Sequence, residues 1–248
     1  MLEMTKKQIR ILHISDIHLD NEIGSGAEKS SAQIGLEAAI DASIEQNVDL
    51  ILLAGDLFDH NRIKVECLNF VDSQFERLLC PLVMIAGNHD CLAEYSIYKR
   101  YNPEEASENV FFLRADAGST CVFKDLGVTV WGRGIVEHHP GHKPLDHIPS
   151  VPEDGWYVGV THGYCVDRDL QSFSSLIRPE EIEASGFDYL ALGHVHVFSF
   201  MEHGVTKAAY CGSPNKGLGK NDMSAALVEL NPQKGVFVNK LNLLPRSF

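Results

Sequence analysis

Strand-like and helix-like segments alternate through the first 90 residues of this 248-residue chain. Residues 8–14, 49–54 and 82–86 are predicted strands, because each is a short, mainly apolar run. Between them, residues 32–46 have apolar positions at helical spacing, and residues 64–79 form a second helical segment. This order predicts βαβ units and therefore a parallel sheet.

The second half of the chain is rich in strand patterns. The expected strands cover residues 110–113, 128–131, 157–160, 189–192, 225–230 and 236–239. One clear helix interrupts them, opened by Pro179-Glu180-Glu181, a sequence that favours helix initiation. The predicted fold class is α/β, with a sandwich of two sheets flanked by helices. Because we find no repeat and no linker, residues 1–248 are expected to form a single domain.

Five polar clusters each follow a predicted strand. They are Asp16-Ile17-His18, Gly55-Asp56, Gly87-Asn88-His89-Asp90, Thr161-His162-Gly163 and Gly193-His194-Val195-His196. Ligand sites of α/β sheets lie beyond the carboxyl ends of the strands, so these loops could converge on one edge. Asp-x-His alone is expected about once by chance, whereas Gly-Asn-His-Asp is expected about 0.003 times in this composition.

The residue types in these clusters are those of a transition-metal site. Carboxylate oxygen and imidazole nitrogen together suit Mn²⁺, Fe and Zn²⁺. Asp-x-His and His-x-His place alternate side chains on the same side of an extended segment, so both can reach one ion. An Asp in a tight turn can bridge two ions, and an Asn oxygen adds a ligand without adding charge.

The order of these clusters resembles the calcineurin-like metallophosphoesterases, whose pattern runs D-x-H, G-D-x-x-[DN], G-N-H-[DE], H, G-H-x-H. Its elements correspond here to Asp16/His18, Gly55-Asp56-Leu57-Phe58-Asp59, Gly87-Asn88-His89-Asp90, His162 and Gly193-His194-Val195-His196. The resemblance implies an α-β-β-α fold with one metal on Asp16, His18 and His196. It implies a second metal on Asn88, His162 and His194, with Asp56 bridging both.

The same resemblance implies two catalytic residues and a mechanism. His89 would stabilise or protonate the leaving oxygen, and Asp90 would hydrogen-bond the His89 imidazole. Two divalent metals, with Mn²⁺ favoured and Fe or Zn²⁺ as alternatives, would lie about 3.5–4 Å apart and activate a bridging water for in-line attack on phosphorus. Their formal charge of about +4 exceeds that of the two carboxylates, so the pocket would attract an anionic phosphoester substrate.

Longer segments resemble one branch of this family. ILHISDIHLD, LILLAGDLFDH, MIAGNHD, YLALGHVH and YCGSP are similar to the nuclease subunit of the bacterial SbcCD complex and to YhaO-like proteins. That branch implies cleavage of DNA phosphodiesters beside an ATPase partner. The chain ends about where the catalytic core would end, before the branch's capping region, and its net charge is −13. Small or single-stranded phosphodiesters are therefore at least as consistent with it as duplex DNA.

Two other functions remain open on the sequence alone, as do any ATPase partner and the oligomeric state. One is hydrolysis of phosphomonoesters or phosphoproteins on the same metal core, and the other is a metal-binding scaffold without catalysis. The longest apolar runs, Leu50–Ala54 and Leu82–Ala86, are short and no secretory signal is visible, which indicates a cytoplasmic protein without membrane segments. The six scattered cysteines are expected to be reduced.

Several histidines and basic residues lie outside the five clusters. His13 is expected to pack in the core, and His138, His139, His142 and His147 are expected in a solvated loop. His60 could line the pocket rim, and Arg62 could clamp phosphate oxygens. In Lys99-Arg100-Tyr101, the aromatic ring could stack a base, although an ordinary helix surface is the simpler interpretation.

Overall fold

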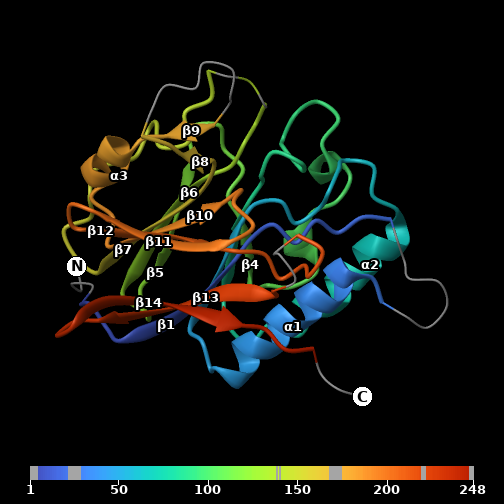
Figure 1. The fold of residues 1–248 in the computed structure, drawn as a ribbon, viewed down its shortest axis with the longest axis horizontal. Coiled ribbons are helices and arrows are strands. Elements are labelled where there is room, and N and C mark those ends of the chain that lie inside the picture. Colours follow the sequence, from blue (N-terminus) through green and yellow to red (C-terminus); the bar gives the residue numbers. More distant parts are fainter. Residues whose placement is uncertain are drawn as a thin grey trace.

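The computed structural model describes residues 5–21, 29–137, 139, 141–167, 175–218 and 222–245. His138, which was expected in a solvated loop, lies outside the described residues. Within the described ranges the chain forms two large β-sheets, three α-helices and two short 3₁₀ helices. The predicted sandwich of two sheets flanked by helices is confirmed (Figure 1).

The first sheet contains the strands of the N-terminal βαβ units. Its order is β14 (Gly235–Asn242), β13 (Ser224–Asn231), β1 (Ile9–Ile14), β2 (Leu50–Ala54), β3 (Leu82–Ile85) and β4 (Val110–Phe112). Strands β1 to β4 pair in parallel, as the alternation of strand and helix predicted. Strand β13 pairs antiparallel with β1 and carries β14 at the sheet edge.

The second sheet is formed by the C-terminal half. Its order is β11 (Phe198–His203), β12 (Thr206–Cys211), β10 (Tyr189–Gly193), β7 (Trp156–His162), β6 (Val128–Arg133) and β5 (Ser119–Phe123). Strands β12, β10, β7 and β6 are parallel neighbours, whereas β11 and β5 pair antiparallel at the two edges. A small sheet of β8 (Tyr164–Cys165) and β9 (Leu176–Ile177) follows β7.

Alternate side chains of the central strands face two different cores. In β1, Ile9 and Ile11 pack between the sheets, whereas Leu12 and Ile14 pack toward the helices. This period of two is intrinsic to an extended chain, and burial on both faces explains why the central strands are apolar throughout. His13 shares the inter-sheet parity, is fully buried and lies 2.8 Å from the Tyr189 hydroxyl through Nδ1, so the expected core role is confirmed.

Helices cover both outer faces of the sandwich. Helices α1 (Ser31–Glu45) and α2 (Val65–Phe75) pack on the first sheet, and α3 (Pro179–Ser185) packs on the second (Figure 1). A capping box begins α1, because Ser30 Oγ accepts from the Gln33 amide and Gln33 Oε1 accepts from the Ser30 amide. Gly186, with φ 71°, ends α3 in a left-handed conformation.

Some elements differ from the expected ones. Helix α2 ends at Phe75 rather than at residue 79, because the amides of Arg77 and Leu78 bond to carbonyls three residues earlier, as in a turn. The sequence did not predict β5, β8, β9, β11 or β12. Gly204, with φ 59°, lies in the turn that joins β11 to β12. The described chain holds all six cysteines, and all are free thiols.

Candidate metal centre

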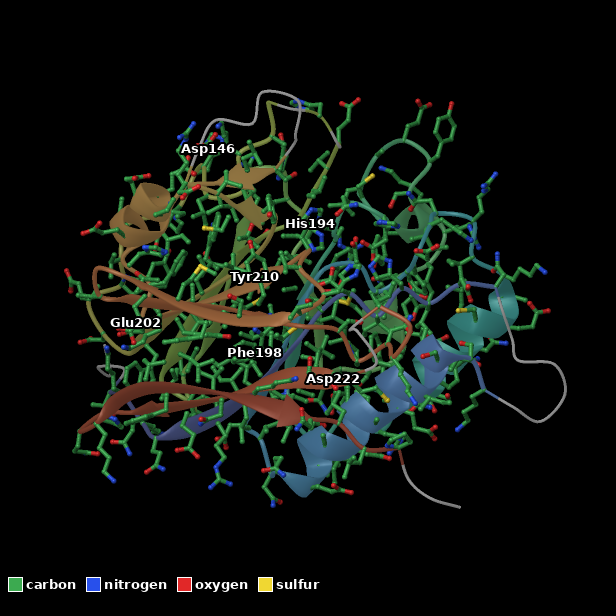
Figure 2. The ribbon with its side chains drawn as sticks, in the orientation of Figure 1. Asp146, His194, Phe198, Glu202, Tyr210 and Asp222 are labelled. Carbon is green, nitrogen blue, oxygen red and sulfur yellow. The ribbon has the colours of Figure 1, made fainter. Side chains whose placement is uncertain are left out.

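The carboxyl ends of five strands meet at one edge of the sandwich. Strands β1, β2 and β3 bring three polar loops from the first sheet, and β7 and β10 bring two from the second. His162 ties the two sheets together here, because its Nδ1 lies 2.8 Å from the carbonyl oxygen of Ala54. Figure 2 shows His194 at this edge, where the two halves of the chain meet. All five clusters therefore converge as the sequence predicted.

Asp16, His18 and His196 form the first group of donor atoms. His196 Nε2 lies 3.6 Å from Asp16 Oδ1, and His18 Nε2 lies 4.0 Å from the same oxygen. Asp16 is completely buried and His18 is buried, whereas His196 is partly exposed. These three residues offer atoms close enough together to hold one metal ion. They are the residues expected to bind the first ion.

Asn88, His162 and His194 form the second group. Asn88 Oδ1 lies 2.9 Å from His162 Nε2 and 2.9 Å from His194 Nδ1. Asp56 lies between the two groups, because its Oδ2 is 3.6 Å from His18 Nε2 and 3.4 Å from His162 Nε2. The structure thus brings all seven expected ligands into one cluster, with Asp56 in the position from which a carboxylate could bridge two ions.

The donor atoms fit divalent cations rather than a hydrogen-bonded polar core. His18 Nε2 is buried and has no hydrogen-bond partner among the described residues, while Nδ1 of the same ring lies 2.9 Å from Asp59 Oδ1. In His162, Nδ1 faces the Ala54 carbonyl, which leaves Nε2 directed into the cluster. A ring nitrogen oriented by a carboxylate or a carbonyl, with the other nitrogen free, is the usual arrangement of metal-binding histidines.

Buried charges in the cluster shift the pKa values of its members. Burial disfavours both ionised groups of the Asp56–His162 pair, but their mutual attraction outweighs it. The pKa of Asp56 consequently lies well below its usual range, and that of His162 rises to about 9. Burial raises the pKa of Asp16. A metal ion binding here would displace the His162 proton and replace its charge.

Four residues of the cluster have left-handed backbone conformations. The φ angles are 56° at Asp16, 53° at His18, 53° at Asp56 and 103° at His194. Such angles are costly for residues other than glycine and persist where the surrounding structure enforces them. Here the Asp16 amide donates to the Gly55 carbonyl at 3.1 Å, and the His194 amide donates to the Asp16 carboxylate at 3.0 Å.

The segment Tyr210–Asn215 supports the strained loops from behind. Ser213 Oγ donates to the Asp16 carbonyl at 2.6 Å, and Asn215 Nδ2 donates to the Ile17 carbonyl at 3.1 Å. The Tyr210 hydroxyl donates to the Gly163 carbonyl at 2.9 Å, next to His162 (Figure 2 labels Tyr210). The sequence of this segment indicated only a resemblance to the nuclease branch. Its positioning role could not be seen there, because the contacts span up to 198 residues.

His89 stands beside the cluster and is held by Asp59. Its ring packs edge-on against His18 with centroids 4.5 Å apart, and 42% of its side chain is exposed. Its Nδ1 lies 2.8 Å from the Asp59 carbonyl oxygen and 3.3 Å from Asp59 Oδ1. Asp59 therefore contacts both His18 and His89. The sequence placed Asp59 inside the Gly-Asp-x-x-Asp pattern but gave it no role.

The expectation that Asp90 hydrogen-bonds the His89 imidazole is wrong. Asp90 is fully buried and accepts from the Gly87 amide at 2.7 Å, the Tyr98 hydroxyl at 2.7 Å and the amides of Leu57 and Phe58 at 3.0 and 3.3 Å. It points inward because its amide donors belong to the two metal-site loops that follow β2 and β3, and its hydroxyl donor is buried. Burial, with the nearby charge of Asp56, raises the pKa of Asp90 to about 6. Asp90 is thus placed to hold these loops together.

The fold and this site define the class of the protein. The chain belongs to the calcineurin-like phosphoesterase family, whose model matches residues 9–198. Proteins of this family bind a dinuclear metal centre, and the family indicates a hydrolase. The family resemblance drawn from the sequence is confirmed. Among the helices of the described chain, none is long and apolar enough to cross a membrane.

Individual relatives place the chain within the family. It is 28% identical over 208 residues to the uncharacterized metallophosphoesterase YhaO of Bacillus subtilis, a match covering 76% of this chain and 48% of YhaO. It is 26% identical over 232 residues to the DNA double-strand break repair protein Mre11 of Methanopyrus kandleri, covering 83% of this chain and 49% of Mre11. The chain spans about half the length of these relatives. The resemblance to the nuclease and YhaO-like branch is therefore confirmed.

A solved structure agrees with the fold. The purple acid phosphatase PPD1 from yellow lupin superposes with a TM-score of 0.63 at 14% identity, covering 97% of this chain and 52% of that chain. At this identity the likeness concerns the fold alone.

Proposed function

We propose that the chain is a dinuclear metal-dependent phosphodiesterase. The observation that carries this proposal is the position of Asp56 between two groups of donor atoms, within reach of His18 on one side and His162 on the other. The similarity to Mre11, a protein named for DNA break repair, favours phosphodiesters over phosphomonoesters.

The residues divide into binding and proton-handling roles. Asp16, His18 and His196 would hold one ion, Asn88, His162 and His194 the other, and Asp56 both. Two bound divalent cations supply a water nucleophile at neutral pH and neutralise charge on the phosphate. The mixture of carboxylate, amide and imidazole donors suits Mn²⁺, Fe and Zn²⁺, and the resemblance to the nuclease branch makes Mn²⁺ the expected ion.

His89 is proposed to donate a proton to the leaving oxygen. Its Nδ1 faces the Asp59 carbonyl oxygen, which fixes one proton on that nitrogen, so the imidazolium form of the ring would deliver its second proton from Nε2 to the leaving oxygen. The half-exposed ring can reach a substrate that lies on the cluster. Asp59 orients this ring and also the metal-binding ring of His18, so it acts through both histidines.

The charge of the chain limits the form of substrate. A net charge of −13 repels polyanions, whereas the cations would attract a single phosphodiester at the site. We therefore propose small or single-stranded phosphodiesters as substrates, with weak and salt-sensitive binding of duplex DNA.

A direct test compares two chromogenic substrates. Protein loaded with Mn²⁺, Zn²⁺ or Fe is assayed on bis-p-nitrophenyl phosphate and on p-nitrophenyl phosphate, with metal content measured in parallel. We expect faster hydrolysis of the diester, with the highest rate in Mn²⁺. Preference for the monoester would favour a phosphatase. Metal binding without hydrolysis of either compound would identify a scaffold and refute the proposal.

A further inference from the structure

A cavity separate from the metal cluster lies beside the loop that carries His89. Its volume is about 440 Å³, within the range of small-molecule sites. It combines apolar, aromatic, hydroxyl and charged side chains, namely Leu92, Ser96, Tyr98, Lys99, Arg114, Asp116 and Val136. None of these residues belongs to the metal cluster. Among them, only Lys99 was part of a segment for which the sequence suggested a functional role.

The cavity and the metal centre share one buried hydrogen-bond network. The Tyr98 hydroxyl donates to Asp90 Oδ2 at 2.7 Å, and Asp90 holds the loop that precedes His89 through the Gly87 amide. Leu92 follows His89 by three residues, so their Cα atoms lie no more than about 11 Å apart. A substrate anchored at the metals could therefore extend past His89 into this cavity.

The Lys99-Arg100-Tyr101 segment faces the cavity with only one of its side chains. Arg100 donates to the Ile63 carbonyl, and Tyr101 is buried with its hydroxyl donating to Asp72; neither residue lines the cavity. Lys99 lines the cavity and is exposed, and its ammonium group forms no ion pair or hydrogen bond with any residue the structure describes. Base stacking on Tyr101 is excluded, whereas a free ammonium group is present.

The charges and apolar walls select an amphipathic anion. Lys99 and Arg114 contribute two positive charges against one negative charge from Asp116, in a chain whose net charge is −13. Arg114 is partly engaged by Glu104, so Lys99 is the available cation. Leu92 and Val136 offer apolar surface that could contact a sugar or a base. A nucleotide combines these features, with a phosphate for Lys99 and flat apolar faces for the walls.

We infer that this cavity binds the nucleotide on the leaving-group side of the scissile phosphodiester. The inference rests on the proposed function, because His89 marks the side from which the leaving oxygen departs. The ligand class is a nucleoside monophosphate unit of a short single strand. Lys99 contacts its phosphate and thereby sets a preference for substrates that continue beyond the cleaved bond.

The kinetic test compares substrates with and without such a unit. Lys99→Ala and Lys99→Glu are assayed on bis-p-nitrophenyl phosphate and on the 5′-phosphorylated dinucleotide and trinucleotide of thymidine. We expect KM for the oligonucleotides to rise about threefold and about tenfold, respectively, with kcat and the diester activity unchanged. Lys124→Glu is the matched control, because it changes the net charge by as much as Lys99→Glu does. Lys124 lies in the turn between β5 and β6, at the end of β6 away from the cavity, so this variant should leave KM unaltered.

A binding measurement separates this inference from the proposed function. Thymidine monophosphate is titrated by NMR into metal-stripped wild-type protein, Lys99→Glu and Lys124→Glu. Weaker binding in Lys99→Glu alone supports the cavity even if no diester is hydrolysed. Equal binding in all three proteins, or an equal loss of diester and oligonucleotide activity in Lys99→Glu, would overturn the inference. If the metal-loaded wild type did not hydrolyse the diester, that result would count against the proposed function only.

Discussion

His13 offers a quantitative test of how tightly the two sheets pack. The side chain is fully buried between them, where its Nδ1 lies 2.8 Å from the Tyr189 hydroxyl. Burial lowers the pKa of His13 from 6.5 to about 3, because the charged imidazolium would lose its hydration. The replacement His13→Gln removes the titrating group and keeps an amide that can bond to Tyr189.

The sign and size of the effect follow from proton linkage. The unfolded state binds a proton near pH 6.5, whereas the folded state resists it down to about pH 3. The contribution of His13 is therefore fully present above pH 6.5 and is lost progressively as the pH falls toward 3. At pH 5.0, which is 1.5 units below the unfolded value, the loss amounts to about 2 kcal/mol at about 1.36 kcal/mol per unit.

The assay is denaturant unfolding of metal-stripped protein at pH 7.5 and pH 5.0. The free energy of unfolding of the wild type should fall by about 2 kcal/mol more than that of His13→Gln. Other groups titrate in both proteins and cancel in this difference. His203→Gln, at the last residue of β11, serves as the control and should follow the wild type. Parallel pH dependence of wild type and His13→Gln would refute the argument that a neutral histidine is buried between the sheets.

Three further outcomes test the site. His89→Ala should keep both metals but lower kcat by about 10²–10⁴-fold, whereas Asp56→Ala should lose metal in elemental analysis; equal metal loss in both would make His89 a ligand. Ser213→Ala removes the hydrogen bond to the Asp16 carbonyl and should cost about 1 kcal/mol in chemical unfolding, with weaker metal binding in titrations. Chelation should lower the melting temperature of the wild type, and an unchanged melting temperature would mean that no metal is bound.

The sequence predicted the clustering of the seven candidate ligands because each of them lies next to a recognisable strand end. A run such as Leu50–Ala54 marks a buried strand, and the polar residue after its last apolar position must emerge at the sheet edge. Parallel pairing then brings Asp16, Asp56 and Asn88 to one edge without further information. The expected convergence depended on local pattern and strand direction alone.

The supporting contacts could not be predicted in the same way. Asp90 is the sequence neighbour of His89 and Asp59 lies 30 residues earlier in another motif, but side-chain direction decides which of them contacts it. Asp90 turns toward buried amides of the Asp56 loop, 33 residues away, and Asp59 remains at the surface beside the imidazole. The bond from Ser213 to Asp16 spans 197 residues and depends on how the second sheet returns to the first. Such contacts follow from tertiary packing, which motif spacing does not encode.

The distribution of ligands between the sheets links metal binding to the packing of the sandwich. Asp16, His18, Asp56 and Asn88 follow strands of the first sheet, whereas His162, His194 and His196 follow strands of the second. Each expected ion would take ligands from both sheets. A bound cation would therefore join the two sheets at this edge, where the contacts between them are mainly polar. Two buried carboxylates there favour cations strongly, since unpaired buried charge is costly. Metal binding and closure of this edge would therefore be one coupled equilibrium.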